Sequence, residues 1–206
     1  MPSYDFIKRA FDLILSILLL LLLSPLFIFI ALLIKSTSQG PIFYPSSRVG
    51  YNGKNLTCWK FRTMHLDADE RLKKILRESK ELKREWETFQ KLKKDPRVIP
   101  IGNFLRKMSF DELPQLWNIL KGDMSLVGPR PFLKDQINRI DLNERDCLLS
   151  VKPGLTGLWQ VSGRSDLPFH KKVELDIYYA KHLNLWIDTK IFFKTFFILA
   201  KKEGAY

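Results

Sequence analysis

The sequence predicts a mostly helical α+β fold in which a membrane helix precedes a compact domain with one small β-hairpin. Three observations lead to this prediction. No charged residue occurs from Leu13 to Ile34. Two strand-like segments flank a turn between residues 42 and 61, and apolar residues recur at three- and four-residue spacings in much of the remaining chain. We therefore expect residues 1–35 to form the membrane helix and residues 36–206 a compact cytoplasmic domain.

The composition indicates an anionic partner. The chain of 206 residues has 34 Lys and Arg against 22 Asp and Glu, a formal net charge of +12. Phospholipid, nucleic acid or a phosphorylated small molecule would complement this charge. The cysteines and histidines are too widely spaced for a Cys/His metal site, so we expect reduced thiols and, for any metal, a hard cation on carboxylate and phosphate oxygens. These residues are Cys58, Cys147, His65, His170 and His182.

The uncharged run from Leu13 to Ile34 is long enough to cross a bilayer as a helix. A cleaved signal peptide fits poorly, because the run is too long and no small-residue cleavage site follows Ser24-Pro25. A straight span and a re-entrant helix both stay open. Pro25 would remove a helical hydrogen bond near the middle of the run, and Ser24 could satisfy the freed carbonyl. Both flanks are basic, which favours the cytoplasmic side for both ends.

Residues 36–63 are predicted to contain the hairpin. Ile42-Phe43-Tyr44 and the segment 56–61 have strand composition, and the Asn52-Gly53 pair between them is typical of a hairpin turn. Lys60 and Arg62 alternate with apolar residues, so both cations should lie on one face of the second strand. That face could bind an anion or could simply be solvated.

The rest of the domain is predicted to be largely helical. Residues 67–94 are expected to form one long charged helix that serves as scaffold or membrane contact. A further helix is expected around residues 132–142, followed by a loop over 152–157 and a strand-like segment over 158–161. Helices over 174–182 and 185–199 end the chain. The last one carries five aromatic residues beside lysines, so it lies in the lipid headgroup layer or packs in the core.

The motif Ser109-Phe110-Asp111-Glu112 fits two interpretations. In the first it is a capping box, with Ser109 as the helix cap and Glu112 three residues later. Pro114 would then fall just beyond the first turn, where it costs a hydrogen bond. A helix that starts at Asp111, with Asp111 as the cap, removes this conflict. Capping alone would explain the motif.

In the second interpretation Asp111 and Glu112 are catalytic carboxylates. A carboxylate can attack phosphorus and form an acyl phosphate, but two anions approach one another only if Mg²⁺ and arginines offset their charge. The candidate phosphate-binding arginines are Arg106, Arg130 and Arg164. Pro129 and Pro131 fix the backbone on both sides of Arg130, which would hold its side chain in place for an anion.

These motifs together resemble the bacterial sugar transferases, the monotopic polyprenyl-phosphate phosphoglycosyl transferases. The resemblance runs from Lys8-Arg9-Ala10-Phe11-Asp12 to the C-terminus. The other segments that carry it are Lys60 to Met64, Ser109 to Gln115, Asn118 to Ser125, Gly128 to Pro131, Lys152 to Gly157 and Tyr178 to Lys181. It implies transfer of a sugar 1-phosphate from a UDP-sugar to polyprenyl (undecaprenyl) phosphate with release of UMP. That reaction would be a first membrane step in the assembly of exopolysaccharide, O-antigen or capsule.

The resemblance also implies residue roles. Asp111 would be the nucleophile that forms a sugar-phosphoryl aspartate and a ligand of Mg²⁺, and Glu112 would position or deprotonate the polyprenyl phosphate. The side chains expected to bind substrate phosphate or nucleotide are Lys60, Arg62, Arg106, Arg130 and Arg164. Ser24-Pro25 would be the break in a re-entrant helix, so the protein would be monotopic on the cytoplasmic face of the bacterial inner membrane. Membrane lipid and a second copy of the chain, as a homodimer, are further candidate partners; nucleic acid is not.

Two features bear on the sugar. The charged segment 67–94 is longer than in the smallest family members, and the ending Gly204-Ala205-Tyr206 resembles the larger hexose-1-phosphate transferases. A hexose such as galactose or glucose is therefore expected, with an N-acetylated amino sugar as the alternative. No further apolar span precedes residue 13, so a minimal catalytic unit is expected. From another class, a non-enzymatic membrane-anchored anion-binding protein would explain the charge and the apolar run, but not Asp111-Glu112.

Overall fold

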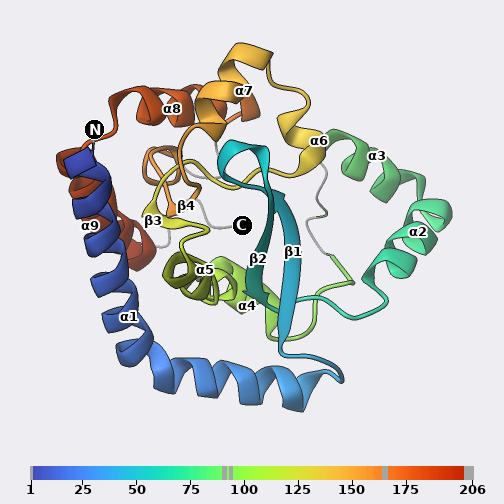
Figure 1. Ribbon diagram of the computed structural model, residues 1–206. Helices are drawn as coiled ribbons and strands as arrows, with labels where there is room; N and C mark the ends of the chain where they lie inside the picture. Colours follow the sequence, from blue (N-terminus) through green and yellow to red (C-terminus); the bar gives the residue numbers. More distant parts are fainter. Residues whose placement is uncertain (1, 90–91, 93–94, 164–166, 202–206) are drawn as a thin grey trace.

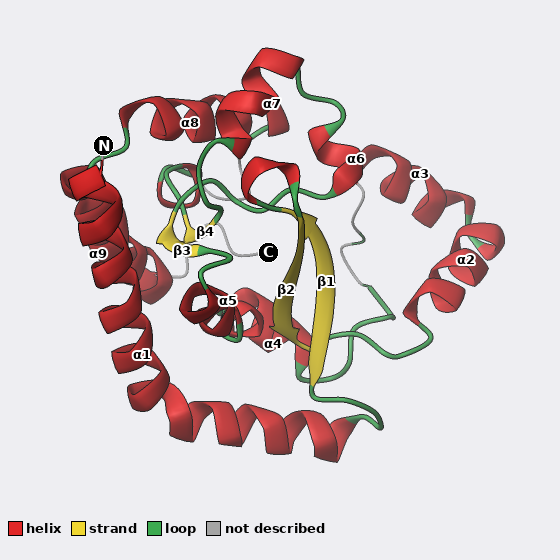
Figure 2. Cartoon of the chain, viewed as in Figure 1, coloured by secondary structure: helices red, strands yellow, loops and turns green. Residues whose placement is uncertain are grey.

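The computed structural model describes residues 2–89, 92, 95–163 and 167–201. It is mostly helical, as predicted, and it has two small sheets where one hairpin was predicted. In Figures 1 and 2 the long helix α1 runs around one side of a body of shorter helices that surround the β1–β2 hairpin. The elements are α1 (Pro2–Thr37), β1 (Phe43–Val49), η1 (Tyr51–Gly53), β2 (Asn55–Phe61), α2 (Ala68–Glu78), α3 (Lys80–Phe89), α4 (Gly102–Lys107), η2 (Phe110–Glu112), α5 (Gln115–Lys121), β3 (Ser125–Val127), α6 (Lys134–Ile137), α7 (Leu142–Leu149), β4 (Gly154–Thr156), η3 (Trp159–Val161), α8 (Phe169–His182) and α9 (Leu185–Lys201).

Helix α1 changes direction sharply about halfway along its length (Figure 1). Pro25 is the proline inside this helix, and it leaves the carbonyl four residues earlier, that of Leu21, without its backbone donor. The Ser24 hydroxyl donates to that carbonyl at 2.8 Å, which confirms the predicted compensation. By length and composition, residues 4–37 could cross a membrane.

The first half of α1 packs on the body through buried polar contacts. The Asp12 carboxylate accepts hydrogen bonds from Ser125 Oγ at 3.1 Å and from the backbone N of Leu126 at 3.0 Å. Lys8 Nζ lies 2.8 Å from Asp188 Oδ2 in α9. The first half of α1 is therefore joined to the body by charged groups as well as by apolar packing, and the predicted domain boundary at residue 35 stays a prediction.

The predicted hairpin is confirmed. Strands β1 and β2 are antiparallel, with Phe43 opposite Phe61 and Val49 opposite Asn55. The turn places Asn52 at φ 53° and Gly53 at φ 74°, two successive left-handed residues. Asn and Gly tolerate the left-handed conformation best, which explains why these two residues occupy the turn.

Strands β3 and β4 form a parallel pair where the sequence predicted only a loop. Gly128 N donates to Thr156 O at 2.9 Å, and Gly154 N donates to Pro129 O at 2.8 Å. A Cβ on Gly154 would lie 2.1 Å from Gly128 N, so only glycine allows the two backbones to approach this closely. The strand predicted over 158–161 is wrong, because this segment forms the 3₁₀ turn η3.

The single helix predicted over 67–94 is also wrong. It breaks at Ser79, whose backbone is extended and whose hydroxyl accepts the Leu82 N–H at 3.2 Å, so that Ser79 ends α2 and starts α3. Part of the predicted range (90–91 and 93–94) lies outside the described residues. The helix expected over 132–142 is also wrong: that range holds the short helix α6, and α7 starts only at Leu142. Helices α8 and α9 confirm the last two predicted helices.

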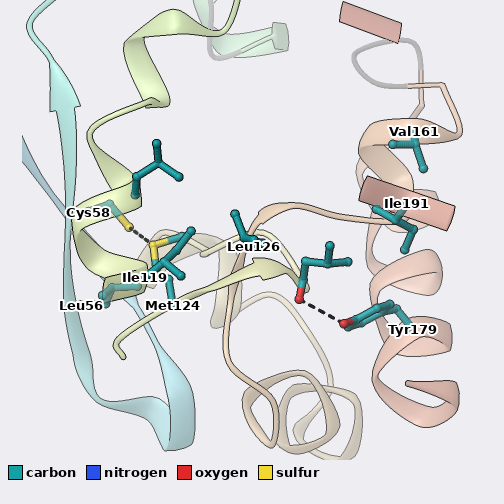
Figure 3. Close-up of a cluster of buried hydrophobic side chains, with 10 residues drawn as sticks. Leu56, Cys58, Ile119, Met124, Leu126, Val161, Tyr179 and Ile191 are labelled. Atoms are coloured by element: carbon teal, nitrogen blue, oxygen red, sulfur yellow. Dashed lines mark hydrogen bonds between the residues drawn. The ribbon is translucent and has the colours of Figure 1, made fainter. Parts of the chain in front are cut away.

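The main core lies between the hairpin, α5, β3 and the last two helices. Figure 3 shows Cys58 beside Met124 at one end of this cluster and Tyr179 at the other. The two sulfur atoms are 3.9 Å apart, and the Tyr179 hydroxyl donates to the Val127 carbonyl at 3.1 Å. Both cysteines are free thiols, as predicted. The core thus fixes β2 and β3, the elements that lead to the candidate site.

Candidate active site

The motif 109–112 is not a capping box. Ser109 is left-handed, with φ 57°, and makes no side-chain cap hydrogen bond. Helix α5 starts only after Pro114, which takes the position before its first residue. Because proline lacks an N–H, a helix that ran through it would lose a bond, whereas at a helix start nothing is lost. Asp111 and Glu112 therefore lie in the separate 3₁₀ turn η2, and neither caps α5.

Glu112 is the centre of an ion-pair cluster. Its Oε1 lies 2.7 Å from Lys60 Nζ, which comes from β2, and 2.8 Å from Arg130 Nη2, which follows β3. Burial alone would raise the pKa of the Glu112 carboxyl, but Arg130 and Lys60 outweigh it and lower that pKa to about 2. Glu112 is therefore ionised at every physiological pH.

Asp111 differs from its neighbour. Burial, followed by the charge of Glu112, raises the pKa of the Asp111 carboxyl to about 6, against the opposing effects of Lys60 and Arg106. Asp111 makes no ion pair within the described part of the chain. Two adjacent carboxyls thus have pKa values pushed in opposite directions, as occurs when two acids carry different roles.

An open polar cavity of about 500 Å³ lies over these two carboxylates. Its lining includes five Lys or Arg side chains and three Asp or Glu side chains. The basic ones are Arg48, Lys60, Arg62, Arg106 and Arg130, and the acidic ones are Asp69, Asp111 and Glu112. The surplus of two positive charges suits a ligand with two negative charges, such as a diphosphate.

Three of the five predicted basic residues lie near the two carboxylates, two of them in direct contact with Glu112. Lys60 and Arg130 contact Glu112 directly. Arg106 donates to Thr63 Oγ1 at 2.9 Å and lines the cavity, and its charge opposes the rise in the pKa of Asp111. These positions agree with a phosphate-binding role, which stays a prediction.

The two other predicted basic residues stand apart. The Arg62 guanidinium donates to Ser38 Oγ, Ser38 O and Gln39 O at 2.6 to 3.1 Å, so it fixes the connection after α1 while lining the cavity edge. Lys60 and Arg62 were expected to lie on one face, and both line the same cavity. Arg62, however, makes its hydrogen bonds to Ser38 and Gln39 and not to Asp111 or Glu112. Arg164 lies outside the described residues.

Sequence reasoning missed two residues of this cavity. Arg48 in β1 donates to Ser46 Oγ at 3.2 Å and to Pro131 O at 3.5 Å. Gln160 in η3 donates to Leu155 O at 3.2 Å, and its buried Oε1 has no hydrogen-bond partner among the described residues. The sequence did contain a signal for Arg48, because Arg48 and Ser46 point to the same face of a strand that pairs with the strand of Lys60. No sequence pattern indicated Gln160.

A second, apolar cavity of about 300 Å³ lies on the other side of η2. Leucines of α1 and aromatic residues of α9 form much of its wall, among them Leu19, Leu23, Leu26, Phe192 and Phe196. Ser109, Glu112 and Gln160 line both cavities. Glu112 thus stands at the boundary between a cationic and an apolar chamber.

The carboxylate pair fits Mg²⁺ only as an open site. The described residues hold no group of three or more His, Cys, Asp or Glu that could cage a metal ion. Mg²⁺ keeps several waters and commonly binds through one or two carboxylates plus substrate phosphates. Asp111 suits that role because it makes no ion pair with the surrounding cations in the described chain, whereas Glu112 is already held by two of them.

The long apolar helix and the cation-lined carboxylate pair are typical of one class: membrane-associated proteins with a site suited to an anionic ligand. Within that class the assignment is specific. The family model described as bacterial sugar transferase matches residues 3–202, and the chain belongs to the bacterial sugar transferase family.

Three relatives are similar over nearly the whole chain. The undecaprenyl-phosphate galactose phosphotransferase of Salmonella typhimurium is 47% identical over 99% of this chain and 42% of its own length. The UDP-glucose:undecaprenyl-phosphate glucose-1-phosphate transferase of Escherichia coli is 38% identical over 100% of this chain and 44% of its own. The exopolysaccharide production protein ExoY of Rhizobium meliloti is 43% identical over 100% and 90%. The chain thus spans less than half the length of the first two relatives.

Proposed function

We propose that the chain transfers a sugar 1-phosphate from a UDP-sugar to polyprenyl (undecaprenyl) phosphate, giving the polyprenyl diphosphate sugar and UMP. The observation that carries the proposal is the position of Glu112 between the two chambers. A nucleotide diphosphate suits the cationic chamber, and the lipid tail of the acceptor suits the apolar one. The name of the Escherichia coli relative contains both a UDP-sugar and undecaprenyl phosphate, and that of the Salmonella relative contains undecaprenyl phosphate and galactose, which supports this pair of substrates.

In the first step Asp111 acts as the nucleophile. Its carboxylate oxygen forms a bond to the phosphorus that carries the sugar, the bond from that phosphorus to the bridging oxygen breaks, and UMP leaves with the electron pair. Arg130, Lys60 and Arg106 offset the negative charge of the diphosphate during this step. When bound beside Asp111, Mg²⁺ would neutralise further charge on the phosphate oxygens.

In the second step an oxygen of the polyprenyl phosphate attacks the same phosphorus, and the Asp111 carboxylate leaves. Glu112 lies at the entrance from the apolar chamber, where this phosphate must arrive. A carboxylate with a pKa of about 2 binds a proton weakly, so of the two roles expected for Glu112 its ion pairs favour positioning over deprotonation. It would do so by holding Lys60 and Arg130 toward the acceptor phosphate.

The proposal is tested by measuring UMP release with undecaprenyl phosphate and a panel of UDP-sugars. UDP-galactose or UDP-glucose is expected to release UMP, because relatives whose names contain galactose or UDP-glucose match nearly the whole chain. UDP-N-acetylglucosamine is the matched control with the same nucleotide and an amino sugar. Release with the amino sugar alone would make it the donor. If no donor releases UMP, the proposal is wrong and the alternative function, a non-enzymatic membrane-anchored anion-binding protein, is favoured.

The first step is expected to slow below a pH of about 6. Asp111 attacks only as the carboxylate, and burial beside Glu112 raises its pKa to about 6, so kcat/KM for UMP release should fall about tenfold per pH unit on the acid side. Glu112→Gln removes the negative charge of Glu112, the second cause of the raised pKa of Asp111. The pH midpoint of any residual activity should therefore be lower than in the wild type. A wild-type midpoint near 4 would contradict the raised pKa of Asp111.

We further propose that α1 enters the membrane and leaves on the side it entered. The bend near the middle of α1 and the exposed aromatic side chains of α9, among them Trp186 and Phe197, support a helix pair at one bilayer surface. Cysteines introduced by Ser3→Cys and Gln39→Cys should both resist an impermeant maleimide in intact spheroplasts and react after permeabilisation. Labelling of position 3 from outside would show a straight span instead.

A further inference from the structure

The turn after β3 is held at three consecutive residues by three different elements. Pro129 O accepts the N–H of Gly154 from β4 at 2.8 Å, and Pro131 O accepts from Arg48 of β1 at 3.5 Å. Between these prolines, the Arg130 N–H donates to Asp176 Oδ2 of α8 at 3.3 Å. Prolines have no N–H, so Arg130 supplies the one backbone donor of this three-residue segment.

Asp176 is an unusual residue for its place in the fold. It is fully buried in α8, where Val173, three residues earlier, and Ile177, the next residue, belong to an apolar cluster. Its second oxygen, Oδ1, has no hydrogen-bond partner among the described residues. A buried carboxyl with one contact at 3.3 Å and one unpaired oxygen contributes little to stability, because desolvation costs more than a single hydrogen bond returns.

The backbone contact leads directly to the catalytic pair. The side chain of Arg130 places Nη2 2.8 Å from Glu112 Oε1, and its guanidinium carbon lies 5.8 Å from the centre of the Trp159 ring. With the backbone fixed by Asp176 and the side-chain end fixed by Glu112, the guanidinium has little freedom. A displacement of about 1 Å in such a group can cost about 10²-fold in rate.

We propose that Asp176 is a positioning residue, which holds the main chain of Arg130 so that its guanidinium stays between Glu112 and the diphosphate of the donor. The inference rests on the proposed function, because Arg130 must act on a phosphate-bearing substrate. It also adds α8 to the elements that shape the site. Asp176 itself touches neither the cationic nor the apolar chamber in the described lining.

A double-mutant cycle tests this role. Asp176→Val removes the acceptor oxygen and should lower kcat for UMP release about ten- to a hundredfold. Asp176→Asn keeps an oxygen toward the Arg130 N–H and should stay within about threefold of wild type. If Asp176 acts through Arg130, Asp176→Val should have almost no further effect in an Arg130→Ala background.

The same double-mutant cycle is repeated with the affinity for UDP as the readout. Calorimetry measures this affinity without catalytic turnover. Asp176→Val should weaken UDP binding in the wild-type background and not in Arg130→Ala. Asp188→Val is the matched control: Asp188 is equally buried but pairs with Lys8 and Tyr179, so its loss should combine multiplicatively with that of Arg130→Ala.

Three outcomes would overturn the inference: multiplicative losses for Asp176→Val and Arg130→Ala, an Asp176→Asn variant as impaired as Asp176→Val, or a lowered melting temperature with unchanged kcat and UDP affinity. Failure of the proposed function gives a different result, since the wild type would then release no UMP from any UDP-sugar while the cycle on UDP affinity could still be read.

Discussion

Asp111→Asn is expected to lower UMP release from a UDP-sugar by about 10³-fold or more, because the amide cannot form the bond to phosphorus. The loss should appear already in the first step, measured as UMP formed without acceptor. Asp123→Asn is the matched control, because Asp123 is an exposed aspartate of the same segment that lines neither chamber. Full activity of Asp111→Asn would remove Asp111 from the nucleophile role.

The same variant should be more stable than the wild type at pH 7. The pKa of Asp111 is higher in the folded protein, about 6, than its ordinary value of 3.8. The folded state therefore loses stability as the pH rises from below 4 through 6, where the buried carboxyl ionises. Asparagine carries no charge at either pH. The melting temperature of Asp111→Asn should therefore exceed that of the wild type at pH 7, where Asp111 is ionised, and nearly equal it at pH 4, where Asp111 is protonated.

Arg130→Ala is expected to lower kcat for UMP release about 10²- to 10³-fold, as for loss of a charge-stabilising group aimed at the transition state. The variant also removes the strongest opposing charge from Glu112, so the pKa of Glu112 should rise. Arg130→Lys should be intermediate, because it keeps the charge and loses the forked pair of donors. Arg139→Ala, an exposed arginine of the next segment, is the control. Equal rates for Arg130→Ala and Arg139→Ala would contradict this role.

The elements that were predicted correctly have a local signal. The hairpin follows from the Asn52-Gly53 turn between two strand-like segments, and α1 from an uninterrupted apolar run. The break at Ser79 was not predicted because the apolar periodicity continues across it. The bond that the Leu82 N–H donates to the serine hydroxyl competes with the helical backbone bond, and the apolar pattern does not show which of the two forms. The β3–β4 pair escaped because strands of three residues show no period.

The candidate site was also predicted only in part. Asp111 and Glu112 are adjacent in sequence, so their proximity could be predicted without knowing the fold, and the family resemblance implied their roles. That Lys60 and Arg130 meet on a single oxygen of Glu112 depends on how β2 packs beside η2, which no local pattern contains. Asp176 did leave a signal, since it stands on the apolar face of α8 with Val173, Ile177 and Ala180.

The half-buried cations on the first half of α1 constrain the order in which the chain is assembled. Arg9 donates to the carbonyls of Ile119 and Leu120, and Lys8 pairs with Asp188, so the partners lie 110 to 180 residues further along the chain. While the chain is being synthesised, the apolar run emerges with only lipid available to cover it. Because Asp188 is synthesised after α1, this helix can finish docking only once Asp188 has emerged. A nascent chain stopped before Asp188 should therefore be held by the membrane but not yet closed around the candidate site.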